Sequence, residues 1–168
     1  MQPLLGARLG LSRVAWAFPV AITLHNLEEG IWLPAWSEQA GALHPVVGAG
    51  EFRFAVFVIA VAAWVVTGVA VRSGRWAAAA AFWVAMLLNV VFPHLLATLL
   101  MRRYAPGLAT ALAINLPVCA YLLRRVERDG LMTRAAVLRS AAIGVPVLLA
   151  SVPVLFAIGR WLSGQRLG

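Results

Sequence analysis

The chain has no lysine, a single cysteine and few acidic residues. All 14 of its basic residues are arginine, and charged residues make up only 12% of the sequence. A soluble domain carries about 25% charged residues, so this scarcity argues against a soluble fold. The lone cysteine, Cys119, excludes an intrachain disulfide. Because it lies in an apolar run, we expect it to behave as a small hydrophobic residue.

Hydrophobic residues, in contrast, make up 62% of the sequence. They form apolar runs close to the roughly 20 residues that cross a bilayer as a helix. These runs lie at about 14–36, 52–72, 76–101, 106–123 and 139–162. The sequence therefore predicts an all-α fold, a polytopic membrane helical bundle with about five transmembrane helices. We expect residues 1–168 to form a single integral membrane domain.

The net charge of +8 comes from arginines near the ends of the apolar runs. This placement favours membrane topology and lipid head groups as the reason for the charge, and we expect no nucleic-acid partner. More arginines fall on the inner side if the N-terminus is inside: Arg8, Arg13, Arg72, Arg75, Arg124, Arg125, Arg128, Arg134 and Arg139. The first run follows Arg8 and Arg13 as in a signal peptide. It contains charged residues and lacks an A-x-A-like site, so we expect a retained transmembrane helix.

His25, Glu28 and Glu29 lie in the middle of the first apolar run. An ionised carboxylate at bilayer depth costs at least a few kcal/mol, and two adjacent carboxylates also repel each other. Such a pair requires a cation, a shared proton or a function. Helical spacing places residues i, i+3 and i+4 on one face, so the three side chains are predicted to form a functional cluster.

Other polar residues occur at a similar depth in the third and fourth runs. At about 1.5 Å per residue from the outer end of each helix, all of them lie roughly 10–17 Å deep. Together with the three residues of the first run, the full set comprises His25, Glu28, Glu29, Asn89, His94 and Asn115. On a straight helix Asn89 and His94 would point about 140° apart, and a kink at Pro93 is expected to correct part of that difference.

The motif His25-Asn26-Leu27-Glu28-Glu29 is close to the H-x-x-E-H pattern of inverted zincins. By that pattern His25 and Glu29 would bind a divalent metal, with His94 as a third ligand and Glu28 as the general base. Zinc suits these ligands, as do iron and manganese. Asn89 and Asn115 are assigned to the catalytic set as orienting hydrogen-bond donors. A hydrogen-bonded cluster without metal remains the alternative.

Three further polar residues stay outside this assignment. His44, in the loop after the first run, is expected to be solvated. Arg102 and Arg103 are expected to anchor the outer interface, with binding of an anionic substrate group as the alternative.

These residues resemble the HXXEE-domain family of bacterial integral membrane proteins. The resemblance covers roughly residues 20 to 120. It rests on the His25–Glu29 motif, on Asn89 with Phe92-Pro93-His94, and on Arg103-Tyr104-Ala105-Pro106-Gly107 followed by Thr110-Ala111. It implies candidate residues and a location in the bacterial cytoplasmic (inner) membrane, and it implies no reaction. A looser similarity to intramembrane CAAX-type proteases concerns only their paired glutamates with His and Asn.

Three functions fit these features. The first is an intramembrane metal-dependent enzyme, a hydrolase of a lipid or peptide-like substrate, with membrane lipids as its surroundings. The second is a proton- or cation-coupled carrier that uses the same residues as a relay. The third is a non-catalytic structural or interaction protein. The sequence fixes neither the substrate nor the oligomeric state.

The arginine distribution predicts the N-terminus inside and the C-terminus outside, with five spans. Reporter fusions at the two termini should therefore give opposite signals, phosphatase activity at the C-terminus and cytoplasmic fluorescence at the N-terminus. Both termini on the same side would contradict five spans.

Overall fold

The computed structural model describes residues 2–41 and 45–164, and these fold into helices without any strand. His44, discussed above, lies outside the described residues. Ten helical segments follow one another along the chain: α1 (Gln2–Val14), α2 (Ala17–Ser37), α3 (Ala49–Ser73), α4 (Ala77–Asn89), η2 (Val90–Leu95), α5 (Leu96–Met101), α6 (Leu108–Thr110), η3 (Ala111–Asn115), α7 (Leu116–Arg128) and α8 (Arg134–Leu162).

Four of the described helices are long and apolar enough to cross a membrane: Ala49–Ser73, Ala77–Met101, Leu108–Arg128 and Arg134–Leu162. The chain is therefore an integral membrane protein with an all-α bundle. The count is close to the five spans expected from the sequence. α2 has 21 residues, enough in length, but it carries the charged motif and is not among the four.

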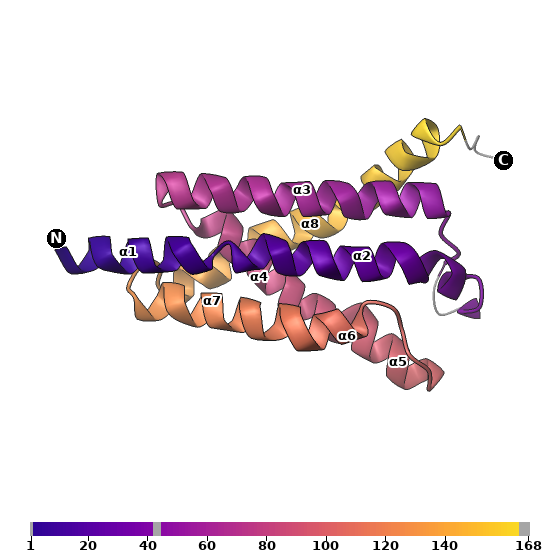
Figure 1. Cartoon of the computed structure of the whole chain (residues 1–168), viewed down its shortest axis with the longest axis horizontal. Helices are drawn as coiled ribbons and strands as arrows, with labels where there is room; N and C mark the ends of the chain where they lie inside the picture. The colour runs from indigo at the N-terminus through magenta and orange to yellow at the C-terminus, as the bar shows by residue number, and fades with distance from the viewer. Residues whose placement is uncertain (1, 42–44, 165–168) are drawn as a thin grey trace.

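The helices run back and forth along one long axis (Figure 1). α1 and α2 follow each other nearly in line, flanked by α3 and α7 (Figure 1). α4 packs against α8, and α3 packs against both α2 and α8. The N-terminus and the C-terminal end of α8 lie at opposite ends of the molecule (Figure 1).

The core at the N-terminal end of α2 is apolar and aromatic. Phe18 contacts Phe82 and Trp83 edge-to-face, with ring centroids 5.2 and 6.3 Å away. Gly144 of α8 lies so close to Ala81 that a side chain there would overlap it. Small residues at helix contacts are typical of membrane bundles, where close backbone approach supplies much of the packing energy. Apolar packing at this end of the bundle holds α2 in place, whereas the middle of α2 carries polar groups.

α2 is also tied to α3 by polar contacts at the level of the charged motif. Asn26 is buried, and its side-chain amide donates a hydrogen bond to the carbonyl of Val56 at 2.7 Å. One turn further, Arg53 donates to the carbonyl of Gly30 at 2.9 Å. These bonds fix the rotation of α2 about its axis. His25 and Glu29 lie about 100° around the helix from this contact, so they are directed toward other helices.

Candidate metal centre

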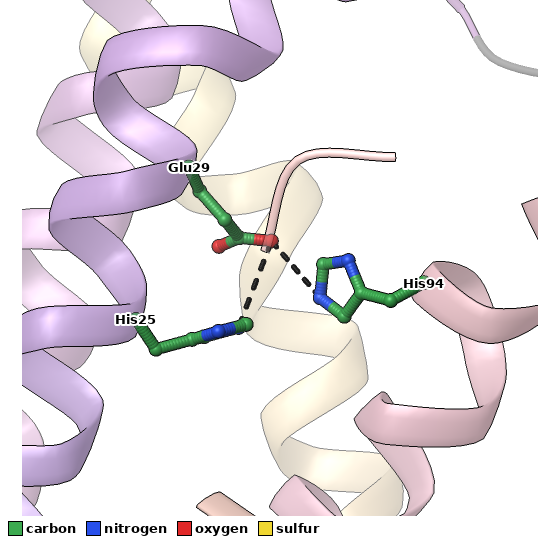
Figure 2. A group of neighbouring side chains, drawn as sticks. All are labelled: His25, Glu29 and His94. Atoms are coloured by element: carbon green, nitrogen blue, oxygen red, sulfur yellow. Dashed lines mark ion pairs between the residues drawn. The ribbon is translucent and has the colours of Figure 1, made fainter. Parts of the chain in front are cut away.

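His25, Glu29 and His94 come together inside the bundle (Figure 2). His25 and His94 are each 1% exposed and Glu29 is 9% exposed. Glu29 Oε1 lies 3.8 Å from His25 Nε2 and 3.2 Å from His94 Nε2. The two imidazoles meet edge-to-face with centroids 5.0 Å apart. Glu29 thus stands between two imidazoles from two different helical segments, as Figure 2 shows.

The break at Phe92 and Pro93 brings His94 into this cluster. Phe92 has an extended backbone (φ −129°, ψ 119°), and Pro93 offers no amide hydrogen to the preceding turn. The helix is therefore broken within Val90–Leu95, and the kink changes the direction of the residues that follow it. Asn89 Oδ1 consequently lies 3.1 Å from His94 Nε2. The 140° separation expected on a straight helix is removed by this local geometry.

Glu28, the neighbour of Glu29, is directed at a different part of the molecule. Its Oε1 accepts hydrogen bonds from the amide of Gly107 (2.9 Å) and from the hydroxyl of Tyr104. Its Oε2 accepts from the amide (3.1 Å) and the hydroxyl (2.6 Å) of Thr110. The carboxylate thus caps the positive N-terminal end of the helix that begins at Leu108. Its role as general base remains a prediction.

Thr110 links Glu28 to His25. The Thr110 hydroxyl oxygen lies 2.9 Å from His25 Nδ1 and donates its one proton to the Glu28 carboxylate, which can only accept. The hydroxyl oxygen must then accept a hydrogen bond from His25 Nδ1–H. In a neutral imidazole this leaves Nε2 with a lone pair facing Glu29. Two electron-rich atoms facing each other in a buried site are stabilised by a cation or a proton between them.

The donor set can hold a divalent metal ion. The ligand atoms of His25, Glu29 and His94 all lie within 4.8 Å of one another. Tetrahedral zinc with bonds of about 2.0–2.1 Å places its ligands about 3.3 Å apart, so small side-chain adjustments would close the site. Two imidazoles and one carboxylate also leave a fourth position open, as in catalytic zinc sites.

The remaining predicted residues lie around this cluster or away from it. Asn115 is completely buried, and no described residue is within hydrogen-bond distance of its side-chain amide. Such an amide usually has a partner in the folded protein, commonly an ordered water. Arg102 and Arg103 are exposed at the end of α5. Asn89 contacts the cluster through its side-chain oxygen, which accepts a hydrogen bond. The catalytic roles of Asn89 and Asn115 stay predictions.

Sequence reasoning assigned no role to Tyr104, Gly107 or Thr110. Two signals were available. The Pro-Gly pair before a helical run marks a helix start, and all three residues lie in the third motif of the family resemblance. Gly107 has a positive φ of 93°, and a β-carbon there would overlap the His94 imidazole and press on the Glu29 side chain. Burial, together with the hydrogen bond to Glu28, raises the pKa of Tyr104, so its phenol stays protonated and donates.

Gly107→Ala should destabilise the protein and displace His94, because the new methyl group overlaps the imidazole as well as straining the backbone. Gly130→Ala is the matched control, with φ of 68° and nothing within 4 Å of the added carbon. Thermal unfolding in detergent should show the strain alone in the control, about 1–2 kcal/mol, and a clearly larger loss for Gly107→Ala. Equal losses would contradict the close packing at His94.

Comparisons with known proteins identify the family that carries this motif. Residues 16–122 match a family described as a protein of unknown function with HXXEE motif. The chain is also 38% identical over 164 residues to the uncharacterised protein YrkK of Bacillus subtilis strain 168, covering 87% of this chain and 95% of the relative. No solved structure matches the chain. The chain belongs to the HXXEE family of proteins.

Proposed function

We propose that His25, Glu29 and His94 bind one divalent metal ion, with zinc as the best fit and iron or manganese as alternatives. The observation that carries the proposal is the 3.8 Å separation of His25 Nε2 and Glu29 Oε1 inside a buried site. The hydrogen bond from His25 Nδ1–H to Thr110, deduced above, leaves a lone pair on that Nε2. A metal cation between these atoms turns a repulsive contact into two bonds. The Glu29 carboxylate would balance part of the metal's charge where water cannot.

We further propose that the centre serves hydrolysis of a lipid or peptide-like substrate. A divalent metal in an open site polarises carbonyl or phosphoryl groups and activates water. A cavity of about 460 Å³ adjoins Asn89, whose Oδ1 contacts His94. The cavity is apolar, with Phe92, Val145 and Leu149 among its lining residues. This chemistry suits a hydrocarbon chain whose polar end reaches the cluster at Asn89.

A second candidate function rests on two polar groups that approach each other inside the bundle. Glu28, Thr110 and His25 are linked by hydrogen bonds, Glu29, His94 and Asn89 form the second group, and His25 Nε2 and Glu29 Oε1 lie 3.8 Å apart where the two groups meet. Such a chain of carboxylates and imidazoles within a membrane can move protons. A proton on Glu29 or His94, in place of a metal, would then stabilise the close approach of Glu29 to the two imidazoles.

Metal content separates these candidates. Wild-type protein purified in detergent should contain about one divalent ion per chain by mass spectrometry, and Glu29→Gln and His94→Ala should each lose it, because every ligand of a three-ligand site is needed. The exposed Glu38 at the end of α2 gives the matched control, Glu38→Gln, which should keep the ion. A wild-type protein that stays metal-free after incubation with zinc, iron and manganese would reject the metal centre and favour the relay.

The link through Thr110 gives a second, independent test. Thr110→Val removes the hydroxyl that accepts from His25 Nδ1, so metal affinity should fall about 10–100-fold, whereas Thr110→Ser should retain it. Nitrogen NMR of the metal-free protein should show His25 protonated on Nδ1 in the wild type and in Thr110→Ser, but not in Thr110→Val. Protonation on Nε2 in the wild type would overturn the deduced tautomer, whether or not metal binds.

A further inference from the structure

A second cavity, of about 310 Å³, adjoins Glu28. It is lined by Glu28, Trp32, Trp36, Tyr104 and Pro106. These residues come from the C-terminal half of α2 and from the segment between α5 and α6, which meet at one end of the bundle (Figure 1). Trp36 Nε1 donates to the carbonyl of Tyr104 at 2.9 Å, which holds the two walls together. Three of the five lining side chains are aromatic.

Glu28 brings negative charge to this aromatic cavity. Among the described residues no arginine or histidine forms an ion pair with it, and all its partners are neutral donors. Arg103 is nearby, with its guanidinium over the Trp36 ring at 5.9 Å, but it hydrogen-bonds to Gln39. An anionic group beside several aromatic side chains attracts a cation.

The hydrogen bonds of Glu28 limit which cation suits the cavity. Two donors reach each carboxylate oxygen, so the four acceptor sites of the carboxylate are filled. A primary ammonium needs free acceptors for its N–H groups and finds none on Glu28. A quaternary ammonium has no N–H groups, so it loses nothing there, and it gains from the negative charge and from the aromatic faces.

We propose that this cavity binds a quaternary ammonium group of the choline class, carried by a lipid head group or by a free solute. The site is separate from the metal centre. Gly107 lies between them, donating its amide to Glu28 on one side and packing against His94 on the other. Binding of the cation therefore does not require a metal at His25, Glu29 and His94.

The test uses radiolabelled choline and the full chain in maltoside micelles. Choline should bind saturably, and unlabelled choline should displace it at least tenfold more effectively than 3,3-dimethylbutan-1-ol, its neutral isostere, or ethanolamine, its primary amine analogue. Equal displacement by the neutral isostere would overturn the proposal, because the cavity would then be merely apolar. Absence of saturable choline binding would also overturn it.

Single substitutions test whether choline binds in this cavity. Trp32 is 62% exposed, so Trp32→Ala should leave thermal unfolding unchanged and weaken choline binding at least fivefold. Trp161→Ala is the matched control, because Trp161 is 78% exposed on α8 and does not line the cavity. Arg103→Gln removes a like charge and should strengthen binding. Unchanged affinity in Trp32→Ala, or equal losses in both tryptophan variants, would overturn the assignment.

A short-chain phosphatidylcholine, used below its micelle concentration, identifies the source of the ligand. If the phosphatidylcholine displaces radiolabelled choline at least tenfold more effectively than unlabelled choline does, the proposal holds with a lipid head group as ligand. If the two compounds are equally effective, the proposal holds with a free solute. A metal-free sample prepared with a chelator should bind choline like the untreated protein, so this result is independent of the metal proposal.

Discussion

Two adjacent carboxylates in an apolar bundle constrain this structure more than any other feature. Glu28 and Glu29 cannot share one partner, because neighbouring residues on a helix point about 100° apart and like charges repel. The protein satisfies them separately. Glu28 receives two amides and two hydroxyls, and Glu29 stands between two imidazoles. Glu28 binds the segment around residues 104–110, and Glu29 contacts His94 of η2. The positions of both segments around α2 are therefore linked to the charges that they stabilise.

The segment between α5 and α6 serves both glutamates at once. Gly107 donates its amide to Glu28, and its lack of a side chain leaves room for His94 beside Glu29. Thr110 continues the link, since its hydroxyl connects Glu28 to His25. Histidines that bind metals usually donate their second ring N–H to an oxygen atom, and His25 Nδ1 has the Thr110 hydroxyl oxygen in that position. Glu28 thus orients, through Thr110, the imidazole that Glu29 faces.

The same geometry separates two kinds of chemistry. The cluster of His25, Glu29 and His94 is buried and offers two nitrogens and an oxygen, which suits a small divalent cation. The cavity beside Glu28 is aromatic and has no free acceptor on its carboxylate, which suits a large cation without N–H groups. A single negative motif therefore supports two distinct cation preferences, because the surroundings of each carboxylate differ.

Several features were accessible from sequence because they depend on local properties. The length of apolar runs predicts membrane helices, and the observed helices overlap the five expected ranges. The cost of buried carboxylates drew attention to the His25–Glu29 motif, and a shared depth indicated His94 as its partner. Family membership was likewise legible from these residues. The first two inferences need only distance along the chain or along one helix axis, and family membership needs only the motif residues.

The sequence by itself thus determined an all-α membrane protein and the polar residues His25, Glu29 and His94 that lie at one depth in it. Only the tertiary structure decided how those groups pair. The broken turn at Phe92 and Pro93 aligns Asn89 with His94, and helical spacing alone does not produce that alignment. The direction of Glu28 toward Gly107 and Thr110 depends on how α2 is rotated and on where a loop some 80 residues away lies. Contacts between distant segments are set by packing of the whole bundle, because no local rule fixes the rotation of one helix against another.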